Sequence, residues 1–145
     1  MRGAVSGNAV ARREARFDLR QLVRAARGAA RLRHAPYSEF PVGVAILDSA
    51  GSIWVGANIE NAAYPLGCCA ERVGLLRWRA ALGPPIRALV IASDAEPPAS
   101  PCGVCRDALL ANCPEAVVYL SGSNVTLGPF RAAEWLPAAH GKALP

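Results

Sequence analysis

Two apolar segments joined by a short polar turn constrain the fold of this chain most strongly. Residues 41–48 (PVGVAILD) and 52–60 (SIWVGANIE) each have the apolar, β-branched composition of a strand. The residues that join them, 48–52 (DSAGS), are small or polar and include a glycine, as a tight connection requires. The sequence therefore predicts an antiparallel hairpin at the start of the core.

Helices and strands alternate after this hairpin. The expected elements are helices over residues 70–82, 102–112 and 131–136, and strands over residues 87–93, 116–122 and 125–127. A Gly-Pro-Pro run ends the first of these helices, and Pro114 stops the second. Such alternation predicts an α/β fold, a sandwich built around a mixed sheet, and a length of 145 residues fits one domain.

Residues 18–33, ahead of the hairpin, have the periodicity of an amphipathic helix. Asp18 and Gln21 resemble a capping pair at its start. One side of the helix is apolar, with Leu19, Leu22, Val23, Ala26 and Ala30, and the other side carries Arg20, Arg24, Arg27 and Arg31. Nine arginines against two acids give residues 1–33 a charge of +7, whereas seven bases against nine acids give the remainder −2.

The uneven charge bears on possible partners and on where the domain begins. We expect residues 1–17 to form a flexible basic extension and residues 18–145 to form the single folded domain. An arginine-bearing helix face is compatible with nucleic-acid binding, but an ordinary solvated face accounts for it and is favoured. No nucleic-acid partner is therefore expected.

The sequence carries no signal for membrane insertion or export. It has no run of 18 apolar residues, and its first residues lack the sustained apolar stretch of a secretory peptide. Glu14 and Asp18 interrupt an arginine-rich leader that would otherwise resemble a transit peptide. Five cysteines, an odd number, argue against a disulfide framework. We therefore expect a cytoplasmic protein whose thiols are ligands, nucleophiles or core residues.

Cys102 and Cys105, in the segment SPCGVCRD, have C-x-x-C spacing, which has three interpretations: a zinc site, a redox dithiol or two core residues. A thioredoxin-like dithiol should follow the first strand of a βαβ unit, whereas this pair follows the third expected strand.

Cys69 directly precedes one expected helix, and Cys102 opens another. The free N–H groups and positive dipole at helix N-termini stabilise thiolates. Two such ends brought together would place these three cysteines around one zinc ion.

Three cysteine ligands would leave one position on zinc open for water, as in catalytic sites. A closed structural site would need a fourth ligand. Cys68 would point away if Cys69 points inward, and Cys113 lies at the far end of its helix. Glu71, two residues after Cys69, is placed to exchange protons with that water without binding the metal. The alternative for Glu71 is a carboxylate that merely favours the helix dipole.

At this point the sequence resembles a known family. The pattern C-A-E at 69–71 followed by P-C-x-x-C at 101–105 resembles the zinc nucleoside and nucleobase deaminases. The segments APYSEFPVGVAIL and GANIENAAYPLGCCAER closely resemble the small homotetrameric cytidine deaminases, in which the first ligand is cysteine. The resemblance spans residues 18–140. It implies a three-layer α/β/α sandwich with a five-stranded mixed β-sheet, and it makes residues 18–145 the catalytic domain.

The resemblance also implies roles for residues around the metal. Phe40 matches the aromatic residue that lines the nucleoside pocket, and Asn58 and Glu60 match the pair that binds the ribose hydroxyl. Ala70 matches the residue whose backbone N–H meets the base. Arg72 matches an arginine that donates to the metal thiolates, which offsets their negative charge.

Other matches imply a homotetramer with shared active sites. Tyr64 and Ala62 match residues that reach the site of a neighbouring subunit. The family ends in an aromatic residue that closes over the base, and this chain has His140 there instead. An imidazole can still stack, but it is smaller and polar.

We therefore expect a zinc-dependent hydrolase that converts cytidine and 2′-deoxycytidine to uridine and 2′-deoxyuridine plus ammonia, in pyrimidine salvage. Water activated by zinc would attack C4 of the cytosine ring, and Glu71 would protonate N3 and then the amino group. Two alternatives stay open. One is a deaminase of a modified nucleoside or of a base in RNA. The other is a zinc-binding module without catalytic activity.

Overall fold

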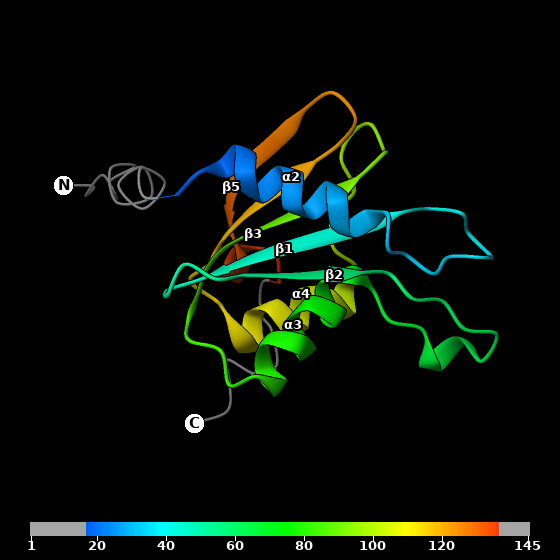
Figure 1. The fold of residues 1–145 in the computed structure, drawn as a ribbon, viewed down its shortest axis with the longest axis horizontal. Coiled ribbons are helices and arrows are strands. Elements are labelled where there is room, and N and C mark those ends of the chain that lie inside the picture. Colours follow the sequence, from blue (N-terminus) through cyan, green and yellow to red (C-terminus); the bar gives the residue numbers. More distant parts are fainter. Residues whose placement is uncertain (1–16, 137–145) are drawn as a thin grey trace.

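The computed structural model describes residues 17–136 of the chain, and its centre is a five-stranded sheet (Figure 1). The strands are β1 Val42–Asp48, β2 Ile53–Ala57, β3 Ile86–Ser93, β4 Val117–Ser121 and β5 Thr126–Arg131. Their order is β2-β1-β3-β4-β5; β3 and β4 run parallel, and each other neighbouring pair is antiparallel. The expected hairpin and mixed sheet are confirmed. The proposed basic extension, apart from Phe17, and His140 lie outside the described residues.

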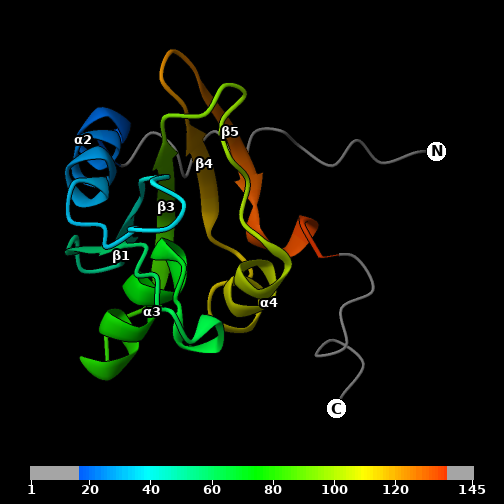
Figure 2. The same ribbon diagram turned by 90° about the vertical axis from the view of Figure 1, so that its right-hand side faces the viewer.

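Helices cover both faces of this sheet. They are α2 Leu19–Ala30, α3 Ala70–Ala80 and α4 Gly103–Asn112. Figures 1 and 2 show α2 on one side of the sheet and α3 and α4 on the other. The side chains of β1 alternate accordingly: Ala45 packs in one apolar cluster with Leu22 and Ala26 of α2, whereas Val44 and Ile46 pack in the second cluster. The expected three-layer α/β/α sandwich is confirmed.

The first described helix begins and packs as its sequence predicts. The Asp18 carboxylate accepts hydrogen bonds from the backbone N–H groups of Arg20, at 2.9 Å, and Gln21, at 3.2 Å, and so caps the helix. The helix buries Leu22 and Ala26 against the sheet. Within residues 17–136, no helix combines the length and the apolar character needed to cross a bilayer.

The C-terminal part of the described chain differs from the expectation. The last strand was expected over residues 125–127 and a helix over 131–136, but β5 continues to Arg131 and a short 3-10 helix follows at Ala132–Glu134. The longer strand contains the Gly128-Pro129 pair. However, β5 is an edge strand, where a proline without an N–H is tolerated, and Phe130 still pairs with Val118.

Glycine at position 56 brings α3 directly against the sheet. A Cβ atom on Gly56 would lie 2.5 Å from the backbone nitrogen of Gly74 and closer still to the carbonyl oxygen of Ala70. No larger residue fits without displacing the helix, because both contacts are to backbone atoms. The start of α3 is therefore set by its contact with β2.

This contact predicts the effect of one added methyl group. The Gly56→Ala variant should lose about 1–3 kcal/mol of unfolding free energy, because the helix must shift away from the strand. Urea unfolding followed by circular dichroism would measure it. Gly28→Ala is the matched control, since nothing lies within 4 Å of its added Cβ. That variant should gain about 0.5–1 kcal/mol, because alanine favours a helix interior. Equal effects of the two substitutions would contradict the packing argument.

Candidate active site

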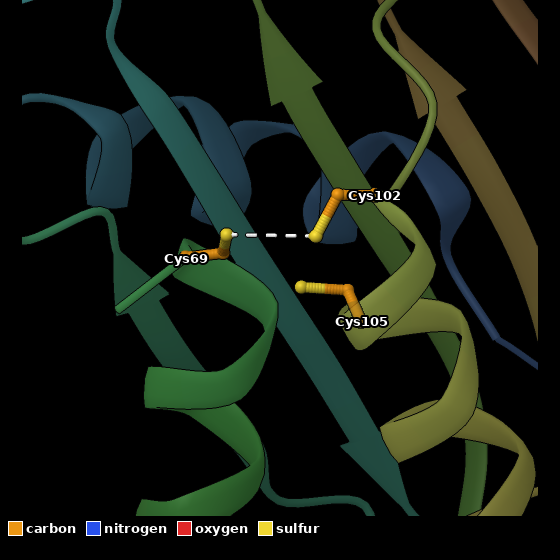
Figure 3. Close-up of side chains that lie close together, drawn as sticks. All are labelled: Cys69, Cys102 and Cys105. Atoms are coloured by element: carbon orange, nitrogen blue, oxygen red, sulfur yellow. Dashed lines mark hydrogen bonds between the residues drawn. The ribbon is translucent and has the colours of Figure 1, made fainter. Parts of the chain in front are cut away.

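Three cysteine side chains converge where two helices begin (Figure 3). Cys69 is the N-cap of α3, Cys102 is the N-cap of α4, and Cys105 follows in the first turn of α4. The sulfur atoms of Cys69 and Cys102 are 3.8 Å apart, and all three sulfurs lie within 4.8 Å of one another. The structure therefore brings together residues that are more than 30 positions apart in the sequence.

The arrangement of the three sulfurs fits a zinc ion. Two thiolates at the usual Zn–S distance of about 2.3 Å, separated by the tetrahedral angle, lie about 3.8 Å from each other. The observed separation of Cys69 and Cys102 is 3.8 Å. Within residues 17–136, the metal-binding group contains these three residues and no fourth ligand. A tetrahedral ion held by three cysteines keeps its fourth position accessible to water or substrate.

The other two cysteines have different surroundings. Cys68 exchanges two backbone hydrogen bonds with Ile59, at 2.8 and 2.9 Å, in an isolated antiparallel bridge. This bridge holds the chain just ahead of Cys69. Cys113 is buried in the apolar cluster between the sheet, α3 and α4, and burial raises its pKa to about 12. The structure therefore places neither residue in the thiol group, as the sequence suggested.

Arg72 lies against the thiols. Its guanidinium donates a hydrogen bond to the sulfur of Cys69 at 3.6 Å, and its Nε is buried without a partner among the described residues. Hydrogen bonds, first from Cys105 and then from Arg72, lower the pKa of Cys69 to about 5, although burial opposes the shift. The pKa of Cys105 is raised by its hydrogen bond to Cys69, so a metal ion would displace the proton held there.

Glu71 is a buried carboxyl beside the thiols. It lies in the first turn of α3 and only 4% of its surface is exposed. Burial raises its pKa to about 7, the charge of Cys69 raises it as well, and a hydrogen bond with Cys105 partly opposes the shift. A carboxyl with this pKa can both accept and donate a proton at neutral pH. An exposed carboxylate that only favoured the helix dipole would have neither the burial nor the shift.

Asn58 and Glu60 organise the segment that precedes β1. The Asn58 side chain donates to the Phe40 carbonyl oxygen and accepts from the Val42 N–H, both at 2.9 Å. The Glu60 carboxylate accepts from the N–H groups of Tyr37 and Ser38 at 2.9 and 3.1 Å, and also from the Ser38 hydroxyl. The hydrogen bond from Ser38 lowers the pKa of Glu60. Sequence reasoning did not identify Ser38, whose position in YSEF carries no separate signal.

The remaining predicted site residues, Ala70, Phe40 and Tyr64, differ in how exposed they are. Ala70 is the first residue of α3 and is fully buried next to Cys69 and Glu71. Phe40 is partly exposed. Tyr64 begins the short 3-10 helix Tyr64–Leu66 and is 90% exposed, so its ring packs against little of the described part of the chain.

The sequence is similar to a known protein family and to individual proteins that carry its name. A family model described as the cytidine and deoxycytidylate deaminase zinc-binding region matches residues 17–121. The chain is 36% identical to the cytidine deaminase of Sporosarcina psychrophila over 127 residues, which cover 87% of this chain and 93% of that protein. It is 37% identical to the cytidine deaminase of Halalkalibacterium halodurans over 124 residues, covering 85% and 94%.

Solved structures give the same result. The cytidine deaminase of Burkholderia pseudomallei superposes with a TM-score of 0.81 at 33% identity, covering 85% of this chain and 99% of that one. The cytidine deaminase of Mycobacterium tuberculosis superposes with a TM-score of 0.74 at 31% identity, covering 86% and 98%. Sequence, fold and the thiol group agree: the chain belongs to the zinc-binding cytidine and deoxycytidylate deaminase family of hydrolases.

Proposed function

We propose that this chain catalyses the hydrolytic deamination of cytidine and 2′-deoxycytidine, with one zinc ion held by Cys69, Cys102 and Cys105. The observation that carries the proposal is the buried Glu71 carboxyl, with its pKa raised to about 7, beside the three sulfurs. A zinc-binding module without activity would need no proton-exchanging group in this place. The product nucleosides fit a role in pyrimidine salvage in the cytoplasm.

In the proposed reaction two protons move from the water to the nucleoside, and one side chain can carry both. Bound zinc polarises water and lowers its pKa to about 7. Glu71 takes a proton as the water oxygen adds to C4 of cytosine, and it protonates N3 of the ring. It then takes the remaining proton from the oxygen now bonded to C4 and delivers it to the exocyclic amino group, and the C4–N bond breaks to release ammonia. Water and cytidine thus yield uridine and ammonia, and Glu71 returns to its starting state.

Arg72 and the two helix N-termini make the thiol group suitable for this chemistry. Three thiolates on a divalent cation leave a net charge of −1, which weakens the metal as a Lewis acid. The hydrogen bond from Arg72 to Cys69 withdraws charge from one thiolate. The dipoles of α3 and α4 act in the same direction, since Cys69 and Cys102 are their N-caps.

The nucleoside would contact the residues that surround this centre. The N–H of Ala70 lies in the first turn of α3, where helical N–H groups lack intrahelical partners, and so it can donate to the base. Phe40 would contact the base or sugar with its ring. Asn58 and Glu60 would bind the ribose hydroxyl with their remaining lone pairs, while their present hydrogen bonds hold the segment in place. Preorganisation of this kind reduces the entropic cost of binding.

We further propose a homotetramer in which neighbouring subunits complete each site. Tyr64 and Leu66 are strongly exposed apolar side chains on one short segment, and Leu32 and Ile59 line an apolar groove of about 160 Å³ beside β2. Exposed apolar side chains that gather on one surface are typical of protein interfaces. In such an assembly Tyr64 and His140 would reach the nucleoside pocket of an adjacent chain.

The metal assignment predicts different outcomes for two adjacent cysteines. Cys69→Ser should lose most of its zinc, because serine is a poor zinc ligand and the site retains two thiolates. Cys68→Ser should keep one zinc per chain, because the role of Cys68 is a backbone bridge to Ile59. Plasma mass spectrometry of the purified variants would measure the content. Retention in the first variant with loss in the second would overturn the ligand set.

The role of Glu71 predicts a loss of activity without a loss of metal or stability. Glu71→Gln should lower kcat/KM by at least about 10²–10⁴-fold, as for other general acid–base groups. Because folding raises the Glu71 pKa from 4.5 to about 7, its ionisation destabilises the folded state as pH rises through that window. The glutamine variant should therefore melt no lower than the parent at pH 8. Activity within tenfold of the parent would show that the carboxyl is structural.

The shared-site proposal predicts that activity depends on assembly. Tyr64→Ala should reduce kcat/KM and shift the chain towards smaller species on dilution, as measured by light scattering after size exclusion. Leu82→Ala is the matched control, since Leu82 is 88% exposed at the end of α3. It should change neither property. A fully active monomer would contradict the shared site and leave the zinc chemistry intact.

A further inference from the structure

A groove on the opposite face of the sheet from the thiols is lined by three arginines. It encloses about 290 Å³ between the end of α2 and the ends of two strands, and its lining includes Arg27, Arg31, Arg33, Ser93 and Asp94. The helix that lines the groove, α2, covers one face of the sheet, whereas α3 and α4, at whose starts the three cysteines lie, cover the other face (Figure 2). The deaminase reaction proposed above does not use it.

Within residues 17–136, no ion pair neutralises the arginines of the groove. Arg27 is fixed in position, because its guanidinium donates to the Ser121 hydroxyl at 3.1 Å and to the Gly122 carbonyl oxygen. The side chains of Arg31 and Arg33 make no hydrogen bond or ion pair with residues 17–136. The ion pair in that part of the chain joins Arg131 and Glu115.

The charge balance of the groove is therefore positive. Against the three guanidinium groups, Asp94 is the acid that lines the hollow in the described part of the chain. Like charges held around one small volume repel each other, and an anion between them removes that repulsion. The planar donors of arginine match the oxygen atoms of a phosphate group in geometry as well as in charge.

We propose that this groove binds the phosphate group of a small ligand. Arg27 supplies a preorganised cation, and Arg31 and Arg33 close on the anion from the end of α2. Two other arginines of the same helix, Arg20 and Arg24, are exposed and do not line the groove. The inference does not depend on the proposed deaminase activity, because it uses none of the residues of the zinc site.

The source of the phosphate is either the free anion or a nucleotide. Pro41, which also lines the groove, follows Phe40 in the segment that Asn58 holds. A nucleotide in the groove would thus lie beside the segment proposed to contact nucleosides. Both sources present the same chemical group, so the experiment compares them directly.

The test is calorimetric titration of the full, zinc-loaded chain with inorganic phosphate, with cytidine 5′-monophosphate and with cytidine. We expect saturable phosphate binding that weakens as the ionic strength rises. Arg31→Ala/Arg33→Ala should raise the Kd at least about tenfold, because two charge-assisted contacts are lost. Arg20→Ala/Arg24→Ala removes the same charge from the same helix outside the groove, and it should change the Kd less than about twofold.

A second variant should change the phosphate affinity in the opposite direction, and it leaves all the arginines in place. Asp94→Asn removes the negative charge from the lining and should tighten phosphate binding about fivefold. If the groove variants change the Kd of cytidine 5′-monophosphate but not that of cytidine, the phosphate enters as part of a nucleotide. If the groove variants change the Kd of inorganic phosphate alone, the ligand is the free anion. The proposal is overturned if no phosphate compound binds saturably, or if the two double variants weaken binding equally.

Discussion

The contact between α3 and β2 at Gly56 is the constraint on which the rest of the active site depends. Cys69, Glu71 and Arg72 all belong to the start of α3, whereas the other two thiols belong to α4. The two groups meet only if α3 lies directly on the strand, and a side chain at Gly56 would prevent this. Metal–ligand distances vary by only about 0.2 Å between sites, so the helix position must be equally well defined.

The same surroundings shift two neighbouring acids in opposite directions. The pKa of Cys69 is lowered to about 5 by hydrogen bonds from Cys105 and Arg72, and that of Glu71 is raised to about 7 by burial and by the charge of Cys69. Hydrogen bonds thus favour the charged thiolate, while exclusion of water favours the neutral carboxyl. In the proposed reaction this separation would suit Cys69 to bind the metal and Glu71 to carry protons.

Much of this architecture could be predicted from the sequence because its signals are local. Strand patterns, helix stops and the position of Cys69 and Cys102 at helix starts all follow from short segments. The course of β5 past Gly128 and Pro129 could not be predicted, because it depends on pairing with β4 at the edge of the sheet. The hydrogen bonds from Ser38 to Glu60 were missed for a similar reason, since they join positions 22 residues apart.

The hydrogen bonds of the Asn58 side chain affect which parts of the molecule can separate locally. Its side chain bonds the backbone on both sides of Pro41, and Val42 begins β1, which lies between β2 and β3 in the sheet. A segment tied in this way to an interior strand separates only when the sheet itself separates. The amide hydrogen of Val42, which Asn58 accepts, should therefore exchange with solvent as slowly as those of the core. If this segment contacts the nucleoside as proposed, it would do so as a fixed wall and not as a lid.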